Sequence, residues 1–289
     1  MSEPCQPARE TTTAPQQAVP KGACDSHFHI FGPGNRYPYA KERGYTPPDA
    51  SVADYRKLID ALGIERQVIV QPSVYGTDNT RTLDALDELG QSCRGVVVIA
   101  PDTPLSELEA MHARGVRGVR FNSVTGGSAG VEALETMAAR IAPLGWHIQL
   151  FLKGEVYPQI EPILKRLPVD FVIDHMGQTM TEKGVDAPGF QAVLRLVEQE
   201  HGWAKVTGAY RISSDGPPYL DAAPFARALI KAAPDRIVWG TDWPHPDVKG
   251  EMPDDGPLLD LLGGWAPDAT LQRRILVDNP ARLYGFDSV

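Results

Sequence analysis

Eight short apolar runs alternate with segments of helical periodicity along this 289-residue chain. The runs are nearly continuous in Val, Ile, Leu and Phe, as is typical of parallel strands buried on both faces. Between them, apolar residues recur at helical spacing, and Ser51 with Asp54 forms a capping-box pattern. The predicted strands lie at 23–31, 67–72, 95–100, 116–121, 147–152, 170–175, 204–208 and 236–240. The predicted helices cover 51–62, 78–89, 103–115, 131–141, 157–167, 189–199, 223–232 and a closing segment, 269–285.

Eight strand–helix units in this length predict an α/β fold, a single (β/α)8 TIM barrel. The alternative is an open doubly wound sheet, but no Gly-x-Gly-x-x-Gly turn follows any predicted strand. We expect the barrel to span residues 22–289. Residues 1–21 are polar, rich in Thr, Gln, Ala and Pro, and carry no apolar signal-peptide core. They predict a flexible N-terminal arm.

Composition narrows the class of protein. Hydrophobic residues make up 42% of the chain, which is enough for a large core. The net charge of −9 argues against nucleic acid as a partner, and no apolar run is long enough for a membrane span. The three cysteines show no paired spacing, which favours a reducing cytoplasm. We expect a monomer or a small homo-oligomer.

Candidate chemistry begins with His27 and His29 in the first predicted strand. Side chains in a strand alternate between two faces, so both imidazoles point the same way. Two imidazoles on one face can hold a metal or converge on one substrate atom. The alternative of two surface histidines is disfavoured by the apolar Ile30 and Phe31 that follow.

More polar side chains follow the other predicted strands. Active sites of such barrels form at the carboxyl ends of the strands. Each residue has a structural explanation of its own: His175 as a core histidine, Asp242 as a turn cap, Arg120 as an ion-pair partner. Their common location at one barrel mouth nevertheless indicates a site. The set comprises Ser73, Tyr75, Arg120, Asn122, His175, Arg211, Asp242 and His245.

Four ordered motifs resemble the amidohydrolase superfamily (amidohydrolase-related family 2). They are Asp-Ser-His27-Phe-His29, Asp174-His175-Met-Gly, Trp-Gly-Thr-Asp242-Trp-Pro-His and Asn279-Pro-Ala-Arg-Leu-Tyr-Gly-Phe286. The resemblance covers residues 22–286 and is strongest to the branch of 2-pyrone-4,6-dicarboxylate lactonase and sugar-lactone enzymes. It implies an enzyme that acts on lactones.

The resemblance also bears on metal binding. Many members of the superfamily hold one or two divalent metals, using a strand-four lysine and a strand-five histidine besides the motifs above. Here Arg120 and Gln149 take those places, which disfavours a two-metal site. A mononuclear zinc site is open to the ligands His27, His29, His175 and Asp242. The lactonase branch implies that the same residues work without metal, so we expect that no cofactor is required.

The mechanism that the resemblance implies is hydrolysis by activated water. An anionic lactone pairs with Arg120 and Arg211, the histidines stabilise oxygen charge, and Asp242 acts as general base. The remaining candidates for substrate binding are Tyr45, Ser73, Tyr75, Asn122, Gln178 and His245.

Two departures limit the substrate. The dicarboxylate lactonase pattern has arginines in the loop after strand four and after the strand-six His-Met-Gly. Here 124–130 contains none, and Gln178 follows Gly177. These departures favour a lactone with one carboxylate or a polyhydroxylated sugar-acid lactone. The alternatives are a lactone isomerase, a mononuclear zinc hydrolase or decarboxylase, and a non-catalytic binding protein on the same barrel.

Overall fold

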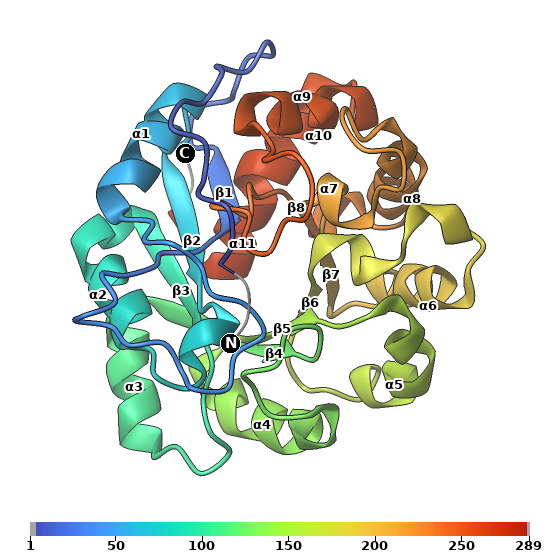
Figure 1. Cartoon of the computed structure of the whole chain (residues 1–289). Helices are drawn as coiled ribbons and strands as arrows, with labels where there is room; N and C mark the ends of the chain where they lie inside the picture. The colour runs from blue at the N-terminus through green and yellow to red at the C-terminus, as the bar shows by residue number, and fades with distance from the viewer. Residues whose placement is uncertain (1–3, 288–289) are drawn as a thin grey trace.

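The apolar runs form one parallel sheet in the computed structural model, which describes residues 4–287. Each strand pairs with the next one in chain order. The first strand also meets the chain after the last: Ser26 N donates to Trp239 O at 2.9 Å, and His29 N to Trp243 O at 2.8 Å. The sheet therefore closes, and the predicted (β/α)8 barrel is confirmed (Figure 1). The strands are β1 (Cys24–Phe28), β2 (Arg66–Val70), β3 (Cys93–Val97), β4 (Val116–Asn122), β5 (His147–Phe151), β6 (Phe171–Ile173), β7 (Gly202–Lys205) and β8 (Ile237–Val238).

Helices surround the barrel and bury their apolar faces against it (Figure 1). The capping box predicted at Ser51 is present, because its side chain accepts from Asp54 N while the Asp54 carboxylate accepts from Ser51 N. No helix of the described residues is long and apolar enough to cross a membrane. The helices are α1 (Val52–Leu62), α2 (Thr80–Leu89), α3 (Leu105–Ala113), α4 (Leu134–Ile141), α5 (Tyr157–Leu164), α6 (Pro188–Val197), α7 (Ala209–Ile212), α8 (Ala223–Ala232), α9 (Asp255–Trp265), α10 (Ala269–Arg273) and α11 (Asn279–Tyr284).

The turns that follow β6 and β8 have unusual backbone conformations. His175 and Asp242 have φ values of 47° and 65°, in the left-handed region that non-glycine residues seldom adopt. Such residues persist only where their surroundings enforce them, and they cluster at functional sites. The turn after β8 is held by Asp25, whose carboxylate accepts from Thr241 N at 2.9 Å and from Thr241 Oγ1 at 2.7 Å. These two hydrogen bonds fix the direction in which the Asp242 side chain points.

The N-terminal segment lies along α9, and in Figure 1 it passes in dark blue between α1 and α9. Thr13 N and Oγ1 donate to the Asp254 carboxylate at 3.0 and 2.6 Å, and Gln16 N donates to Asp260 at 2.8 Å. Cys5 N donates to Thr46 O at 2.8 Å, next to the site residue Tyr45. The first three residues of the predicted arm and the last two of the predicted barrel segment lie outside the described residues.

Candidate active site

Three imidazoles converge on one carboxylate oxygen at the carboxyl end of the barrel. The Nε2 atoms of His27, His29 and His175 lie 3.6, 3.6 and 3.9 Å from Asp242 Oδ1. All four side chains are buried. The strand register explains the first two positions, because His27 and His29 project from the same face of the chain. Gly208 makes room for the third, since a Cβ there would lie 2.8 Å from His175 Nδ1.

The two oxygens of Asp242 have different surroundings. Oδ2 accepts from Tyr210 OH at 2.6 Å and forms an ion pair with Arg211 Nε. Oδ1 is buried and has no hydrogen-bond partner among the described residues. Burial alone would raise the pKa of Asp242, but Arg211 and the nearby histidines outweigh it and hold the pKa well below its usual range. Oδ1 is therefore an ionised oxygen that is free to accept a proton or to bind a cation.

The histidines are neutral at ordinary pH. Burial lowers the pKa of His29, and it lowers the pKa of His175 to about 3. The Nδ1 atom of His29 lies 2.7 Å from the carbonyl oxygen of Val70. A carbonyl oxygen only accepts, so Nδ1 carries the proton and the Nε2 lone pair of His29 faces Asp242 Oδ1. Two acceptors 3.6 Å apart then require a proton, a water or a cation between them.

The side chains around Asp242 Oδ1 have the chemistry and the spacing to coordinate one divalent cation. His27 Nε2 and Asp242 Oδ1 are buried polar atoms without a hydrogen-bond partner in the described part of the chain. The metal-binding atoms of His27, His175 and Asp242 all lie within 4.8 Å of one another. Imidazole nitrogens with a carboxylate oxygen are the ligands that zinc prefers. The residues present therefore fit a mononuclear ion.

A narrow chamber of about 20 Å³ opens beside these groups. Arg120 and Arg211 both line it near the ring of Phe151, with guanidinium carbons 5.1 and 5.9 Å from the ring centre. The chamber shares Arg211 and Phe151 with an outer vestibule of about 490 Å³. A ligand entering from the vestibule therefore meets the guanidinium of Arg211 before it reaches Asp242. The chamber is lined by His29, Tyr45, Arg120, Asn122, Thr125, Phe151, His175, Arg211, Asp242, Pro246 and Asp247.

The structure brings the other predicted residues to different depths. Gln178 lines the vestibule. Ser73 accepts from Thr125 Oγ1 at 2.9 Å, and Asn122 Oδ1 accepts from Thr125 N at 3.0 Å, so both order the wall of the chamber. Tyr75 points away: its hydroxyl accepts from Gly32 N at 2.9 Å, under the loop after β1.

His245 also lies behind the chamber rather than in it. Its Nε2 is 3.2 Å from Asp255 Oδ2, and its Nδ1 is 3.2 Å from the hydroxyl of Tyr210. Tyr210 in turn donates to Asp242. His245 therefore reaches the Asp242 carboxylate through Tyr210, which was not among the predicted site residues.

A buried network beneath the histidines was also missed. Lys205 is fully buried in β7, and its Nζ donates to Ser26 O at 2.8 Å and to Gln149 Oε1 at 2.9 Å. Asp174 Oδ2 accepts from Gln149 Nε2 at 3.0 Å and from Arg120 Nη2 at 3.3 Å. The sequence signal was a charged residue inside an apolar strand, a position where charges occur only when they are paired.

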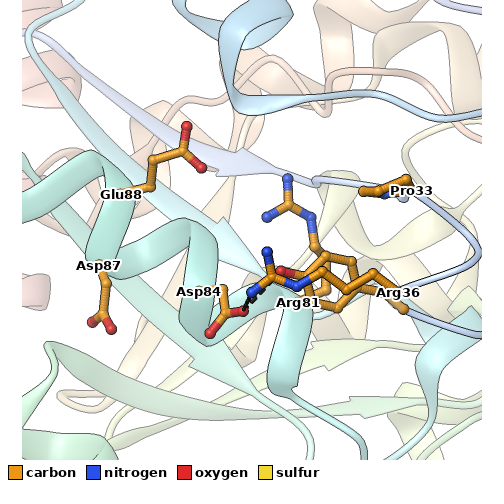
Figure 2. Close-up of a pocket in the computed structure, with 7 residues that line it drawn as sticks. Pro33, Arg36, Arg81, Asp84, Asp87 and Glu88 are labelled. Atoms are coloured by element: carbon orange, nitrogen blue, oxygen red, sulfur yellow. Dashed lines mark hydrogen bonds and ion pairs between the residues drawn. The ribbon is translucent and has the colours of Figure 1, made fainter.

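The molecule has another cavity, of about 420 Å³, lined by residues of α2 and of the loop after β1 (Figure 2). Its charged groups are mostly matched with one another. Arg36 pairs with Asp84 at 3.0 Å, and Asp87 pairs with Arg114 at 2.8 Å. None of the predicted site residues lines it, so it is not the candidate active site.

The barrel fold and the residues at the ends of its strands define the protein family to which the chain belongs. An amidohydrolase family model matches residues 24–286, and the chain belongs to that family, which confirms the resemblance found in the sequence. It is 43% identical over 286 residues to a 2-pyrone-4,6-dicarboxylate hydrolase of Comamonas testosteroni, covering 95% of this chain and 94% of that protein.

Two further relatives match over nearly their whole length. A 4-sulfomuconolactone hydrolase of Hydrogenophaga intermedia is 44% identical over 273 residues, covering 92% of this chain and 90% of the relative. A D-galactarolactone isomerase of Agrobacterium fabrum is 34% identical over 281 residues, covering 96% of each chain.

Proposed function

We propose that this chain is a lactone hydrolase that acts on a lactone bearing a carboxylate. The observation that carries the proposal is the chamber itself, where the unpartnered Oδ1 of Asp242 lies beside two guanidiniums. Relatives at 43% and 44% identity are hydrolases of lactones, which supports the same reaction here. The prediction of an enzyme acting on lactones agrees with these relatives.

Substrate binding starts with the arginines. Arg211 pairs with Asp242 in the structure, and its side chain is 15% exposed toward the vestibule. A planar guanidinium binds a carboxylate through two parallel hydrogen bonds, so an incoming substrate carboxylate competes with Asp242 for Arg211. Arg120 is held by Asp174 and by Gln71 O at 3.3 Å, which leaves its Nε without a partner among residues 4–287.

The chemical step then uses the free oxygen of Asp242. Oδ1 takes a proton from water while the water oxygen bonds to the lactone carbonyl carbon. The carbon–oxygen bond of the ring breaks, the ring oxygen leaves, and the proton passes from Asp242 to that oxygen. The product is an open-chain hydroxy acid or its tautomer. Arg211 and the Tyr45 hydroxyl lie at the chamber as donors toward the developing oxyanion.

The histidines stabilise oxygen charge only if a proton or a cation lies at their Nε2 atoms, because the Nε2 of His29 faces the chamber as a lone pair. His27, His29, His175 and Asp242 would hold a divalent ion. Such an ion, when bound, polarises the carbonyl and lowers the pKa of water. We keep metal independence as a proposal, and the metal content of the purified protein, with activity after chelation, tests it.

The substrate class follows from the charges that line the site. Gln178 is an amide, and the loop over 124–130 carries no cation. The chamber is lined by two guanidiniums, and the vestibule adds Lys249, which pairs with Asp247 at 2.6 Å. One guanidinium can bind one substrate carboxylate, and the other then has N–H groups left to donate to carbonyl or hydroxyl oxygens. We therefore propose a monocarboxylate lactone or a sugar-acid lactone as substrate.

A lactone isomerase is the second candidate, favoured by the relative at 34% identity that is an isomerase. In that reaction a hydroxyl of the substrate replaces water as the nucleophile. We also keep the cytoplasmic location, the absence of a nucleic-acid partner and a monomeric or small oligomeric state as proposals.

The test compares a monocarboxylate lactone with its methyl ester. We expect the acid to turn over and the ester to lose roughly 100-fold in kcat/KM, which corresponds to about 3 kcal/mol for a paired carboxylate. Asp242→Asn should lower kcat by at least about 10³-fold, as expected for loss of the base and its charge. Near wild-type turnover by Asp242→Asn would refute the role of Asp242, and equal turnover of acid and ester would refute the role of the arginines.

A further inference from the structure

The strongest unused feature of the molecule is the charged cluster beneath His27. Lys205 and Asp174 are both fully buried inside the barrel, where an unpaired charge would be very costly. Neither reaches the chamber. Both lie next to Nδ1 of His27, on the side of the ring that faces away from Asp242. Lys205 Nζ is 3.4 Å from this atom, and Asp174 Oδ1 is also 3.4 Å from it.

These two neighbours favour opposite tautomers of His27. An ammonium only donates, so a bond from Lys205 requires a lone pair on Nδ1 and places the ring proton on Nε2. A carboxylate only accepts, so a bond to Asp174 requires the proton on Nδ1 and leaves the lone pair on Nε2. The tautomer decides whether His27 offers the chamber a donor or an acceptor.

The donors and acceptors around His27 favour the tautomer with the proton on Nδ1. Two of the three Lys205 hydrogens are used by Ser26 O and Gln149 Oε1. Asp174 Oδ2 already accepts from Gln149 and Arg120, whereas Oδ1 is buried without a partner in the described structure. If the third Lys205 hydrogen pointed to His27, Oδ1 would face a ring lone pair at 3.4 Å with no donor. If His27 Nδ1 donates to Oδ1, the third hydrogen can also turn to Oδ1, 3.5 Å away.

We propose that Asp174 is a positioning residue that fixes the ring proton of His27 on Nδ1, and that Lys205 holds Asp174 in place for this purpose. His27 then offers its Nε2 lone pair to the chamber, as His29 does through Val70. The reaction affected is the one proposed above, so the functional part of this inference rests on that proposal. The assignment of the His27 tautomer does not depend on the proposed function.

The first test reads the tautomer directly by long-range ¹H–¹⁵N correlation on full-length protein labelled with ¹⁵N-histidine. His27→Gln assigns the signals. We expect Nδ1 to be protonated in the wild type and in Lys205→Met. In Asp174→Asn the Asn carbonyl stays with Arg120 and Gln149, so the amide turns its NH₂ to the ring and moves the proton to Nε2. His112 of α3 is the internal reference, because Trp146 Nε1 donates to its Nδ1 at 2.9 Å and keeps the ring proton on Nε2 in every variant.

The rival arrangement, in which Lys205 donates to His27, gives a different pattern. It predicts a proton on Nε2 in the wild type, on Nδ1 in Lys205→Met and no change in Asp174→Asn. Either a wild-type Nε2 proton or an unchanged tautomer in Asp174→Asn overturns the proposal. If Asp174→Asn does not fold, the wild type and Lys205→Met still separate the two arrangements.

The second test measures kinetics on a lactone that the wild type turns over. Reversing a histidine tautomer by Asp-to-Asn exchange costs serine proteases about 10⁴-fold in kcat. A proton on His27 Nε2 would point at Asp242 Oδ1, 3.6 Å away, and would make this oxygen a weaker base. We therefore expect Asp174→Asn to lose roughly 10²- to 10⁴-fold in kcat with KM changed less than about fivefold, since the chamber arginines remain. Val238→Ala, a buried substitution in β8, controls for loosening of the core. A normal kcat together with a reversed tautomer would refute the functional role, whereas absence of turnover in the wild type would refute the proposed function and leave the tautomer result standing.

Discussion

Stability at acid pH should depend on His147, which is buried at the start of β5. Its ring packs beside Gly118, where any Cβ would lie 2.6 Å from it, and makes an edge contact with Tyr284. Burial, with the charge of Lys205 added to it, lowers the pKa of His147 from 6.5 to about 3. The unfolded chain therefore binds a proton at this residue that the folded chain rejects over that pH range.

Because the unfolded chain binds this extra proton, the free energy of unfolding falls as the pH falls. A histidine whose folded pKa is depressed contributes stability that is fully present above 6.5 and is lost as the pH falls toward 3. Each pH unit well inside that window costs about 1.4 kcal/mol, and the unfolded histidine is only half protonated at pH 6.5, so lowering the pH from 6.5 to 4.5 costs about 2 kcal/mol at this residue alone. His27, His29 and His175 act in the same direction, so the wild type should lose more than this in total.

The assay is urea unfolding of wild type and His147→Leu at pH 6.5 and pH 4.5. We expect the variant to lose about 2 kcal/mol less than the wild type between the two pH values. Ile148→Val, the neighbouring buried residue, should lower stability equally at both. If His147→Leu and wild type lose the same free energy, the histidine is not buried neutral and the reasoning is wrong.

Two further predictions concern the N-terminal arm and the vestibule. Gly256→Ala should dislodge the arm from α9, because the new Cβ would lie 1.9 Å from Thr13 O, whereas the Cβ of the control Gly264→Ala on the same helix meets no atom within 4 Å. Trypsin cleavage at Arg9 should accelerate roughly tenfold in Gly256→Ala only, and equal cleavage of the two variants would show that the arm is not packed. Gln178→Arg adds a cation to the vestibule and should lower KM for a dicarboxylate lactone about tenfold relative to the monocarboxylate; an unchanged ratio would show that Gln178 does not contact substrate.

The barrel could be predicted because buried parallel strands are continuous apolar runs, and each of the eight appears as such a run. Helix α9 was missed because Gly256, Pro257, Gly263 and Gly264 lower its helix propensity. Its formation depends on packing against the rest of the fold, which local sequence does not encode.

The chamber residues His29, Arg120 and Asp242 could be predicted from the convergence of strand ends at one mouth of the barrel. Tyr75 does not line the chamber, because it lies in a 3₁₀ turn beyond β2 where strand alternation no longer sets direction. Asp174 and Lys205 were missed because their importance lies in partners on other strands, and sequence spacing carries no information about those contacts.

The most direct test of the central claim is turnover of a panel of aromatic-derived and sugar-acid lactones in H₂¹⁸O, followed by NMR and mass spectrometry. A hydrolase forms a bond between the water oxygen and the lactone carbonyl carbon, so we predict one ¹⁸O atom in the new carboxylate of a ring-opened product. An isomeric lactone without ¹⁸O would identify the isomerase instead, and no turnover of any lactone would contradict the account.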